Sequence, residues 1–297
     1  MQKIIAHIRL MRPANVVTAI ADILAGFAAS GLALQWLESG SYDNTLLWLV
    51  LATIGLYAGG VVFNDVFDAE LDRTERPERP IPSGEATLFS AALFGSLLLG
   101  MGILSAWLVS AASLIIAVLV AACALLYDAW GKHQSWFGPI NMGMCRGGNL
   151  LLGVSAIPAA LADIWYISLI PIIYIAAITM ISRGEVHGGS SSTLQAAAGL
   201  YALVILSILV LAVFFNTAFW QVLPFLALLA YFIFPPLLKA IRMPEPKLIG
   251  LSVKAGVLSL IILDAALATA FTGWVYGLIV LLLFPVSRFV AKAFAVT

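Results

Sequence analysis

The chain has 297 residues, of which 62% are hydrophobic and 10% are charged, and its formal net charge is zero. No soluble domain of this length needs so much apolar surface, so the composition excludes an ordinary soluble enzyme and predicts a polytopic α-helical membrane protein. The apolar runs are continuous rather than alternating, which excludes a membrane barrel, and the zero net charge gives no basic field to attract nucleic acid.

Ten apolar segments of membrane-spanning length follow one another, which predicts an all-α bundle in one transmembrane domain over residues 1–297. They cover 13–36, 45–67, 86–108, 110–130, 138–160, 164–182, 194–216, 219–240, 250–271 and 274–292. The last two also fit one span followed by a re-entrant piece, so nine helices are the alternative count.

Lysine and arginine are confined to one side of these segments. The connections after the odd-numbered segments contain none, whereas both chain ends and the even-numbered connections are basic. The positive-inside rule then predicts a multi-pass protein of the inner (cytoplasmic) membrane with both termini in the cytoplasm. The ends of segments 45–67 and 164–182 reach that same cytoplasmic face.

Polar residues inside the first and fifth segments are candidate functional groups. Arg12 and Asn15 lie at the cytoplasmic mouth, where both are candidates for contacting a phosphorylated substrate, and a boundary anchor is the alternative for Arg12. Asp22 lies deeper, where its charge requires a proton or a partner. Arg146 and Asn149 share a helix face, and Arg146 either contacts the substrate or neutralises an aspartate such as Asp22.

The second segment ends in a run of acidic residues. Asn64, Asp68 and Asp72 stand at i, i+4 and i+8 and therefore share one helix face, with Asp65 one position round. Carboxylates aligned this closely repel one another unless a cation neutralises them. Oxygen ligands suit Mg²⁺, which also shares its coordination sphere with phosphate oxygens. The run therefore predicts a magnesium site that holds a phosphorylated substrate.

The loop 73–84 that follows combines arginine with proline. Arg73 and Arg79 add bidentate donors for phosphate. A solvated boundary loop is the alternative interpretation, but such a loop has no reason to align three oxygen ligands and then stiffen itself with three prolines.

Two stretches carry a family resemblance. NDVFDAELDRTERPERPIPSG, residues 64–84, resembles the first aspartate-rich motif of the UbiA family of intramembrane prenyltransferases, and its ending resembles the chlorophyll-synthase-like branch. RPANVVTAIADILAG, residues 12–26, resembles that family's first helix. The resemblance implies a UbiA-type bundle in which Mg²⁺, held by two acidic motifs, binds an isoprenyl diphosphate. The diphosphate ionises to an allylic carbocation, and the prenyl group passes to an acceptor.

The resemblance assigns roles residue by residue. The metal-binding positions of the first motif are matched by Asn64, Asp68 and Asp72. Asp65 is the motif's adjacent acid, and Arg79 matches the arginine before the Pro-Ile-Pro turn, which implies a diphosphate contact. Lys132 stands in the loop that supplies basic diphosphate contacts in the family, and a topology-setting lysine is its alternative role.

The second acidic motif departs from the family pattern, which places two or three aspartates at the end of the sixth helix. Residues 182–189 read SRGEVHGG, with Glu185 as the only carboxylate. The resemblance makes Glu185 a metal ligand and, together with Asp65, Asp68 and Asp72, one of the catalytic carboxylates. Arg183 and His187 are candidates for binding the diphosphate directly in place of a second cation. This variant resembles the EboC-like proteins of the bacterial Ebo clusters.

The predicted function is an intramembrane transferase that moves a prenyl group from an isoprenyl diphosphate to an unidentified hydrophobic or amphipathic acceptor, with Mg²⁺ as cofactor. One alternative is a non-catalytic prenyl-lipid-binding or scaffold protein, suggested by the single carboxylate of the second motif. The other is a transporter in which Asp22, Arg146 and Asp264 line an ion path. Transporter sites usually lie near the membrane midplane, whereas the polar chemistry here lies at one face, and Asp264 is interpreted as a structural hydrogen-bonding residue.

Overall fold

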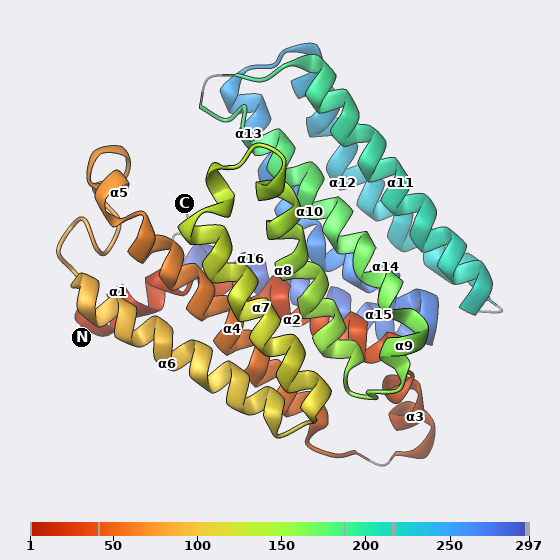
Figure 1. Cartoon of the computed structure of the whole chain (residues 1–297). Helices are drawn as coiled ribbons and strands as arrows, with labels where there is room; N and C mark the ends of the chain where they lie inside the picture. The colour runs from red at the N-terminus through yellow and green to blue at the C-terminus, as the bar shows by residue number, and fades with distance from the viewer. Residues whose placement is uncertain (1, 41, 187, 216–217, 295–297) are drawn as a thin grey trace.

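The structure is a computed structural model that describes residues 2–40, 42–186, 188–215 and 218–294. Within these ranges every regular element is a helix (Figure 1). The helices are α1 (Gln2–Leu10), α2 (Pro13–Ala29), α3 (Leu32–Ser39), α4 (Thr45–Phe67), α5 (Ala69–Glu75), α6 (Leu88–Trp107), α7 (Ala111–Ala129), α8 (Phe137–Val154), α9 (Ala160–Ile164), α10 (Leu169–Ser182), α11 (Ser191–Phe215), α12 (Leu223–Arg242), α13 (Pro246–Leu258), α14 (Leu260–Thr272), α15 (Trp274–Leu281) and α16 (Leu283–Phe294). Short 3-10 turns lie at Gly131–His133, Trp165–Ser168 and Phe219–Val222.

The all-α membrane architecture is confirmed, and the described ranges contain eight or nine spans, which fits the alternative count of nine better than ten. Eight helices in the described ranges are long and apolar enough to cross a membrane, or nine if the bent pair Lys3–Leu10 and Pro13–Ala29 is one span. The predicted segment 138–160 is α8, whose sequence through Arg146 and Asn149 is too polar for that criterion. Because α8 packs against α2, α7 and α10, its polar groups face protein rather than lipid.

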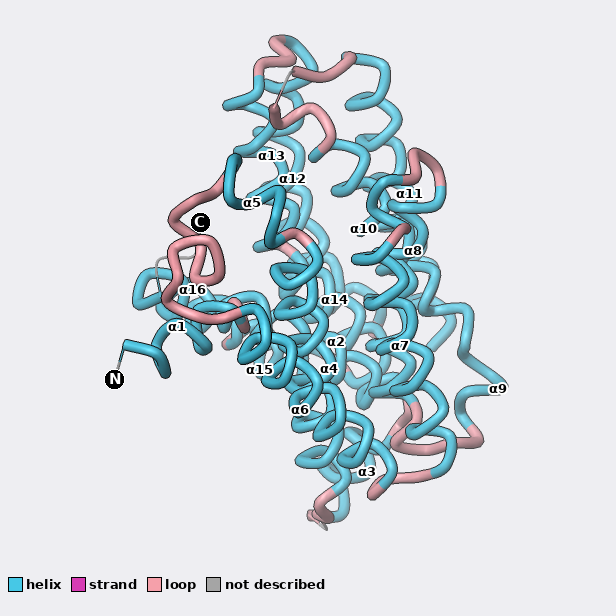
Figure 2. Tube along the Cα trace, turned by 60° about the vertical axis from the view of Figure 1, so that its left-hand side comes forward, coloured by secondary structure: helices cyan, strands magenta, loops and turns pink. Residues whose placement is uncertain are grey.

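The bundle has two distinct ends. Both views place α5 and α13 at one end of the molecule and α3 and α9 at the other (Figures 1 and 2). The acidic run at the end of α4 therefore lies at the α5 end, hereafter the acidic end.

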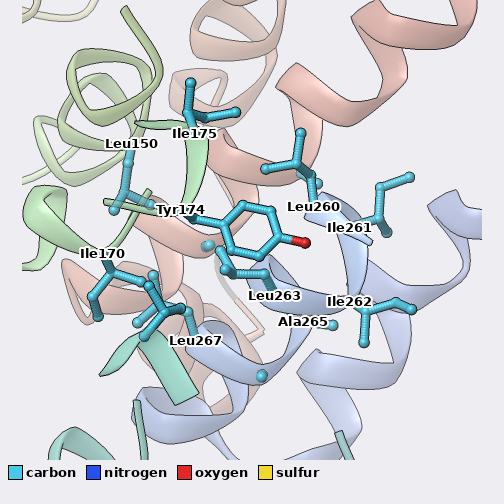
Figure 3. Packing of buried hydrophobic residues seen from close by; sticks show 14 of the residues in the cluster. Leu150, Ile170, Tyr174, Ile175, Leu260, Ile261, Ile262, Leu263, Ala265 and Leu267 are labelled. Atoms are coloured by element: carbon cyan, nitrogen blue, oxygen red, sulfur yellow. The ribbon is translucent and has the colours of Figure 1, made fainter. Parts of the chain in front are cut away.

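The centre of the bundle is formed by α14, which is buried at every position from Leu260 to Ala270. Apart from Asp264 and the threonines Thr269 and Thr272 the helix is apolar, and such a helix belongs inside a bundle because it gains little from contact with water. Figure 3 shows the ring of Tyr174, from α10, among Leu260 and Leu263. The Tyr174 hydroxyl donates to the Gly256 carbonyl at 2.9 Å, so this buried polar atom is satisfied.

Two glycines bring α2 and α8 into backbone contact. A Cβ on Gly26 would lie 2.1 Å from the Leu150 carbonyl oxygen, and a Cβ on Gly153 would lie 2.5 Å from that of Ile23. No larger residue fits at either position without separating the helices. This close approach places the deep polar groups of α2 against those of α8.

Candidate active site

A cavity of about 330 Å³ lies between α2, α4, α7, α8 and α10, with the junction of α13 and α14 behind it. Near the acidic end its wall contains Arg12, Asn15, Asn64, Tyr127 and Asp128. Its apolar wall is formed by Leu56, Val61, Val120, Ala124, Met142, Ile175, Ile178, Val257 and Leu260. A cavity with a charged mouth and an apolar interior fits a ligand with a charged head and a hydrocarbon tail.

The predicted register of the acidic run is preserved in the structure. The α-helix is interrupted at Asp68, yet Asp68 N donates to Asn64 O at 3.0 Å and Asp72 N donates to Asp68 O at 2.8 Å. These i to i+4 hydrogen bonds carry the helical repeat across the break between α4 and α5. Asn64, Asp68 and Asp72 therefore keep the common face that their spacing predicted.

Arginines hold two carboxylates of the first motif. An Arg12 Nη lies 2.6 Å from Asp65 Oδ1, and Arg79 Nη1 lies 3.2 Å from the same oxygen. Arg79 Nη1 also lies 2.6 Å from Asp72 Oδ2, so one guanidinium bridges two acids. Both arginines, expected to contact the diphosphate, thus lie within reach of the positions expected to hold it.

The third carboxylate pairs with the loop after α7. Lys132 Nζ forms an ion pair with Asp68. The neighbouring Asn64 side chain donates from Nδ2 to Asp128 Oδ1 at 2.9 Å. Asp128, near the end of α7, and Lys132, in the 3-10 turn that follows, therefore complete the ring of polar groups around the first motif.

Arg12 reaches its carboxylate through a strained backbone. It stands between α1 and α2 at φ 47° and ψ 67°, and Pro13 follows it. A residue other than glycine in this left-handed region costs about 1–3 kcal/mol and is further disfavoured before proline. The strain persists because Arg12 closes the bend between the two helices while its guanidinium binds Asp65, which supports a functional rather than a boundary role.

Three other predicted residues take separate positions. Asn15 lines the cavity. Arg73 forms an exposed pair with Glu70 at 2.8 Å, away from the cavity wall. Arg183 is exposed and donates to the Gln134 carbonyl at 3.0 Å. His187 lies outside the described residues.

The second motif reaches the same end of the bundle but not the cavity. Glu185 is exposed, and α13 lies beside it, because a Cβ on Gly250 would be 3.5 Å from Glu185 Oε1. Partial burial raises the pKa of Glu185 above its ordinary value, and Arg76 acts in the opposite direction. In the described ranges no three acidic, histidine or cysteine side chains converge on one metal position. The metal set Asn64, Asp68, Asp72 and Glu185 therefore stays a prediction.

A second polar cluster lies deeper, between α2 and α8. Arg146 Nε lies 2.7 Å from Asp22 Oδ2, and its Nη2 donates to the Thr18 carbonyl at 2.6 Å. Asn149 Nδ2 also donates to Asp22 Oδ2, at 2.8 Å. The interpretation that Arg146 neutralises Asp22 is confirmed, and Arg146 lines the cavity as well, with its guanidinium 5.8 Å from the Tyr57 ring centre.

Asp264 completes this deep cluster in an unexpected way. It is fully buried, and neither carboxyl oxygen accepts a hydrogen bond from a donor in the described part of the chain. Its side chain faces the carboxyl of Asp22 instead. The expected hydrogen-bonding role therefore holds only if one of these two carboxyls carries a proton.

The sequence interpretation missed Asp128 as a component of the site. It gave attention to Lys132, four residues later, as the basic group of this loop. No local signal marks Asp128, because α7 ends at Ala129, Lys132 lies in the 3-10 turn that follows, and the contact of Asp128 with Asn64 depends on the approach of α7 to α4.

Comparison with known proteins gives a consistent picture. A profile of the UbiA prenyltransferase family matches residues 23–239. A digeranylgeranylglyceryl phosphate synthase of Methanothrix thermoacetophila is 31% identical over 155 residues, which are 52% of this chain and 56% of that protein. The chain spans about half the length of the curated relatives it matches.

Solved structures share the fold. A UbiA homolog from Aeropyrum pernix K1 superposes with a TM-score of 0.67 at 17% identity, over 84% of this chain and 96% of that one. A UbiA homolog from Archaeoglobus fulgidus bound to GPP and Mg²⁺ superposes with a TM-score of 0.62 at 14% identity, over 93% and 99% of the two chains.

Proposed function

Because the chain belongs to the UbiA prenyltransferase family, we propose that it transfers a prenyl group from an isoprenyl diphosphate to an acceptor inside the membrane. The observation that carries the proposal is the cavity, whose charged mouth adjoins the first acidic motif and whose interior is apolar. The diphosphate would bind at the mouth and the isoprenoid tail along Leu56, Val120 and Ile178. The fold shared with a homolog bound to GPP and Mg²⁺ supports an isoprenyl diphosphate as the ligand.

The residues proposed to hold Mg²⁺ are Asn64, Asp68 and Asp72. They offer amide and carboxylate oxygens on one helix face, a donor set that suits Mg²⁺ when phosphate oxygens and water fill its other positions. When bound, Mg²⁺ neutralises the charge that develops on the departing diphosphate.

The basic side chains have a complementary role. Arg12, Arg79 and Lys132 each pair with a carboxylate of the motif, so three bases balance Asp65, Asp68 and Asp72. On binding, these donors would turn from the carboxylates to the diphosphate, since guanidinium and ammonium groups bind both anions. The leaving group then meets positive charge already in place, which lowers the barrier to ionisation. The loop 73–84 would cover the mouth and exclude the water that competes for the carbocation.

Finer assignments follow from the same premises. The basic residues gathered at the acidic end support a cytoplasmic location for it and for both termini, in the inner membrane. The relatives' name supports a glycerol-phosphate lipid carrying a free hydroxyl as the first acceptor to test. The sequence SRGEVHGG supports placement in the Ebo-type branch.

The proposal is tested by release of diphosphate from a radiolabelled prenyl diphosphate. The purified chain in lipid nanodiscs should release it only with Mg²⁺ and an acceptor lipid present, and EDTA should abolish release. Retained binding without release under any acceptor would instead favour a lipid-binding scaffold. Movement of intact substrate across a proteoliposome would favour the transporter.

A further inference from the structure

Asp128 is the one acid among the described residues that line the cavity. It is the penultimate residue of α7 and is 5% exposed. Within the described ranges it forms no ion pair, whereas Asp65, Asp68 and Asp72 are each bound by an arginine or a lysine. The carboxylate nearest the ligand space is therefore the one that no base holds.

The contact between Asp128 and Asn64 fixes the orientation of a proposed metal ligand. An ionised carboxylate only accepts hydrogen bonds, so the amide nitrogen of Asn64 must be the end that faces Asp128. The Asn64 carbonyl oxygen, the atom able to bind a cation, then points away from Asp128 Oδ1. Asp128 thus orients the Asn64 amide.

The surrounding charges favour a shared cation site. Lys132 lies four residues after Asp128 and pairs with Asp68, and the charges of both act on the Asp128 carboxyl. Once Lys132 turns to a diphosphate, Asp68 and Asp128 are left as two neighbouring carboxylates. Such a pair is stabilised by a divalent cation, and Mg²⁺ commonly takes one or two protein carboxylates together with substrate phosphates.

The second motif offers no equivalent group. Glu185 is exposed, does not line the cavity, and has Arg76 as its charged neighbour. Because the aspartates after α10 are missing, the diphosphate site has carboxylates on only one side, from α4 and α5; a set of carboxylates on one side of the site is called an acidic wall here. Asp128 stands on the facing helix at the same depth as Asn64, where a second wall is needed.

We propose that Asp128 supplies the second acidic wall of the diphosphate site, binding Mg²⁺ together with Asn64 and Asp68 in place of the second motif. This assignment rests on the proposed function, because it concerns the same diphosphate site. It explains how a chain with a single carboxylate at the second motif retains two acidic walls.

The test is a Mn²⁺ titration of the full chain in nanodiscs, followed by electron paramagnetic resonance with inorganic pyrophosphate present. Asp128→Asn is expected to weaken Mn²⁺ binding about 10–100-fold, as loss of a ligand or its close partner does. The amide oxygen of the new side chain can still accept the hydrogen bond from Asn64 Nδ2, so the melting temperature of the variant should stay near that of the parent. Asp128→Glu, which keeps the charge, should recover most of the lost affinity and provides a second variant if Asp128→Asn does not fold.

The controls separate this assignment from the proposed function. Glu70→Gln removes an exposed carboxylate near the motif and should leave Mn²⁺ affinity unchanged, while Glu185→Gln should lose less than Asp128→Asn. If Asp128→Asn kept the parental Mn²⁺ affinity while Asp68→Asn lost affinity, the assignment of Asp128 would be overturned and the proposed function would stand. If Glu185→Gln lost as much Mn²⁺ affinity as Asp128→Asn, Glu185 of the second motif would bind the metal as well, and Asp128 would not replace it. Parental affinity in Asp68→Asn would overturn the first-motif metal site and the proposed function with it.

Discussion

Two charged clusters border the same cavity, and they are built differently. The first motif joins Asp65, Asp68 and Asp72 to Arg12, Arg79 and Lys132 through side-chain pairs alone. The deep cluster ties Arg146 and Asn149 to Asp22 and also to the backbone carbonyls of α2. The first can exchange its partners without disturbing a helix, whereas the second is part of the contact between α2 and α8.

The bases of the first motif are more exposed than the deep pair, although its carboxylates are not. The Arg12 side chain is 26% exposed and that of Arg79 16%, while their partners Asp65 and Asp72 are 6% exposed; Asp22 is 0% and Arg146 7% exposed. Ion pairs near water contribute little to stability, whereas breaking a buried pair leaves an uncompensated charge in a medium of low dielectric. We therefore expect the first motif to determine activity and the deep cluster to determine stability.

The largest expected effect is on the deep cluster. Arg146→Leu leaves Asp22 buried beside a second carboxyl with no base, and should lower the unfolding free energy by about 3–5 kcal/mol. Equilibrium unfolding in mixed detergent micelles measures the change. Adding Asp22→Asn should recover much of the loss, because it removes the stranded charge. An Arg146→Leu variant as stable as the parent would show that the pair is not the source of stability.

The features of the fold that depend on the periodicity of a single helix could be predicted from the sequence. The apolar runs located the helical segments, although the predicted segments 13–36, 250–271 and 274–292 each divide into two helices. The spacing of Asn64, Asp68 and Asp72 gave their common face, because both features follow from helical periodicity. The polar segment around Arg146 was also correctly assigned to a helix. Its neighbours, which decide whether it meets lipid or protein, are set by packing between helices far apart in sequence.

The partners of the charged residues could not be predicted for the same reason. Arg12, Arg79 and Lys132 were expected to face a diphosphate, and nothing in the local sequence shows that each also pairs with a carboxylate of the motif. The role of Asp128 depends on the approach of α7 to α4, which no spacing within either helix encodes. The sequence thus identified most of the chemistry at the mouth but not its pairing.

A comparable effect on rate is expected in the first motif. Asp68→Asn should slow diphosphate release about 10²–10³-fold, because it removes charge from a site that stabilises the leaving group. Its unfolding free energy should change by less than about 1 kcal/mol, since the pair with Lys132 is partly exposed. Rates at saturating Mg²⁺ and unfolding curves give the two numbers. Destabilisation as large as in Arg146→Leu would erase the distinction between the clusters.

A smaller effect should follow from Arg79→Lys, which keeps the charge but not the bridge between Asp65 and Asp72. Loss of one charge-assisted hydrogen bond, about 1.5 kcal/mol, corresponds to about tenfold in the rate of diphosphate release. Arg73→Gln is the matched control, because its pair with Glu70 is exposed and lies away from the cavity wall. Equal losses in the two variants would mean that the loop contributes only general charge.

The smallest expected effect has the opposite sign. Asp264→Asn replaces a buried carboxyl, which receives no hydrogen bond from a donor in the described residues, by an amide of the same size. The new N–H can donate to Asp22 without requiring a shared proton, so the unfolding free energy should rise by about 0.5–1.5 kcal/mol. The gain should be greater at high pH than at low pH, because protonation already allows the parent's two carboxyls to bond. Unfolding measured at both pH values tests this, and a variant less stable than the parent at high pH would mean that Asp264 contributes as an acid. The carboxyls of the deep cluster would then gain and lose protons, and this cluster could no longer be described as a fixed part of the contact between α2 and α8.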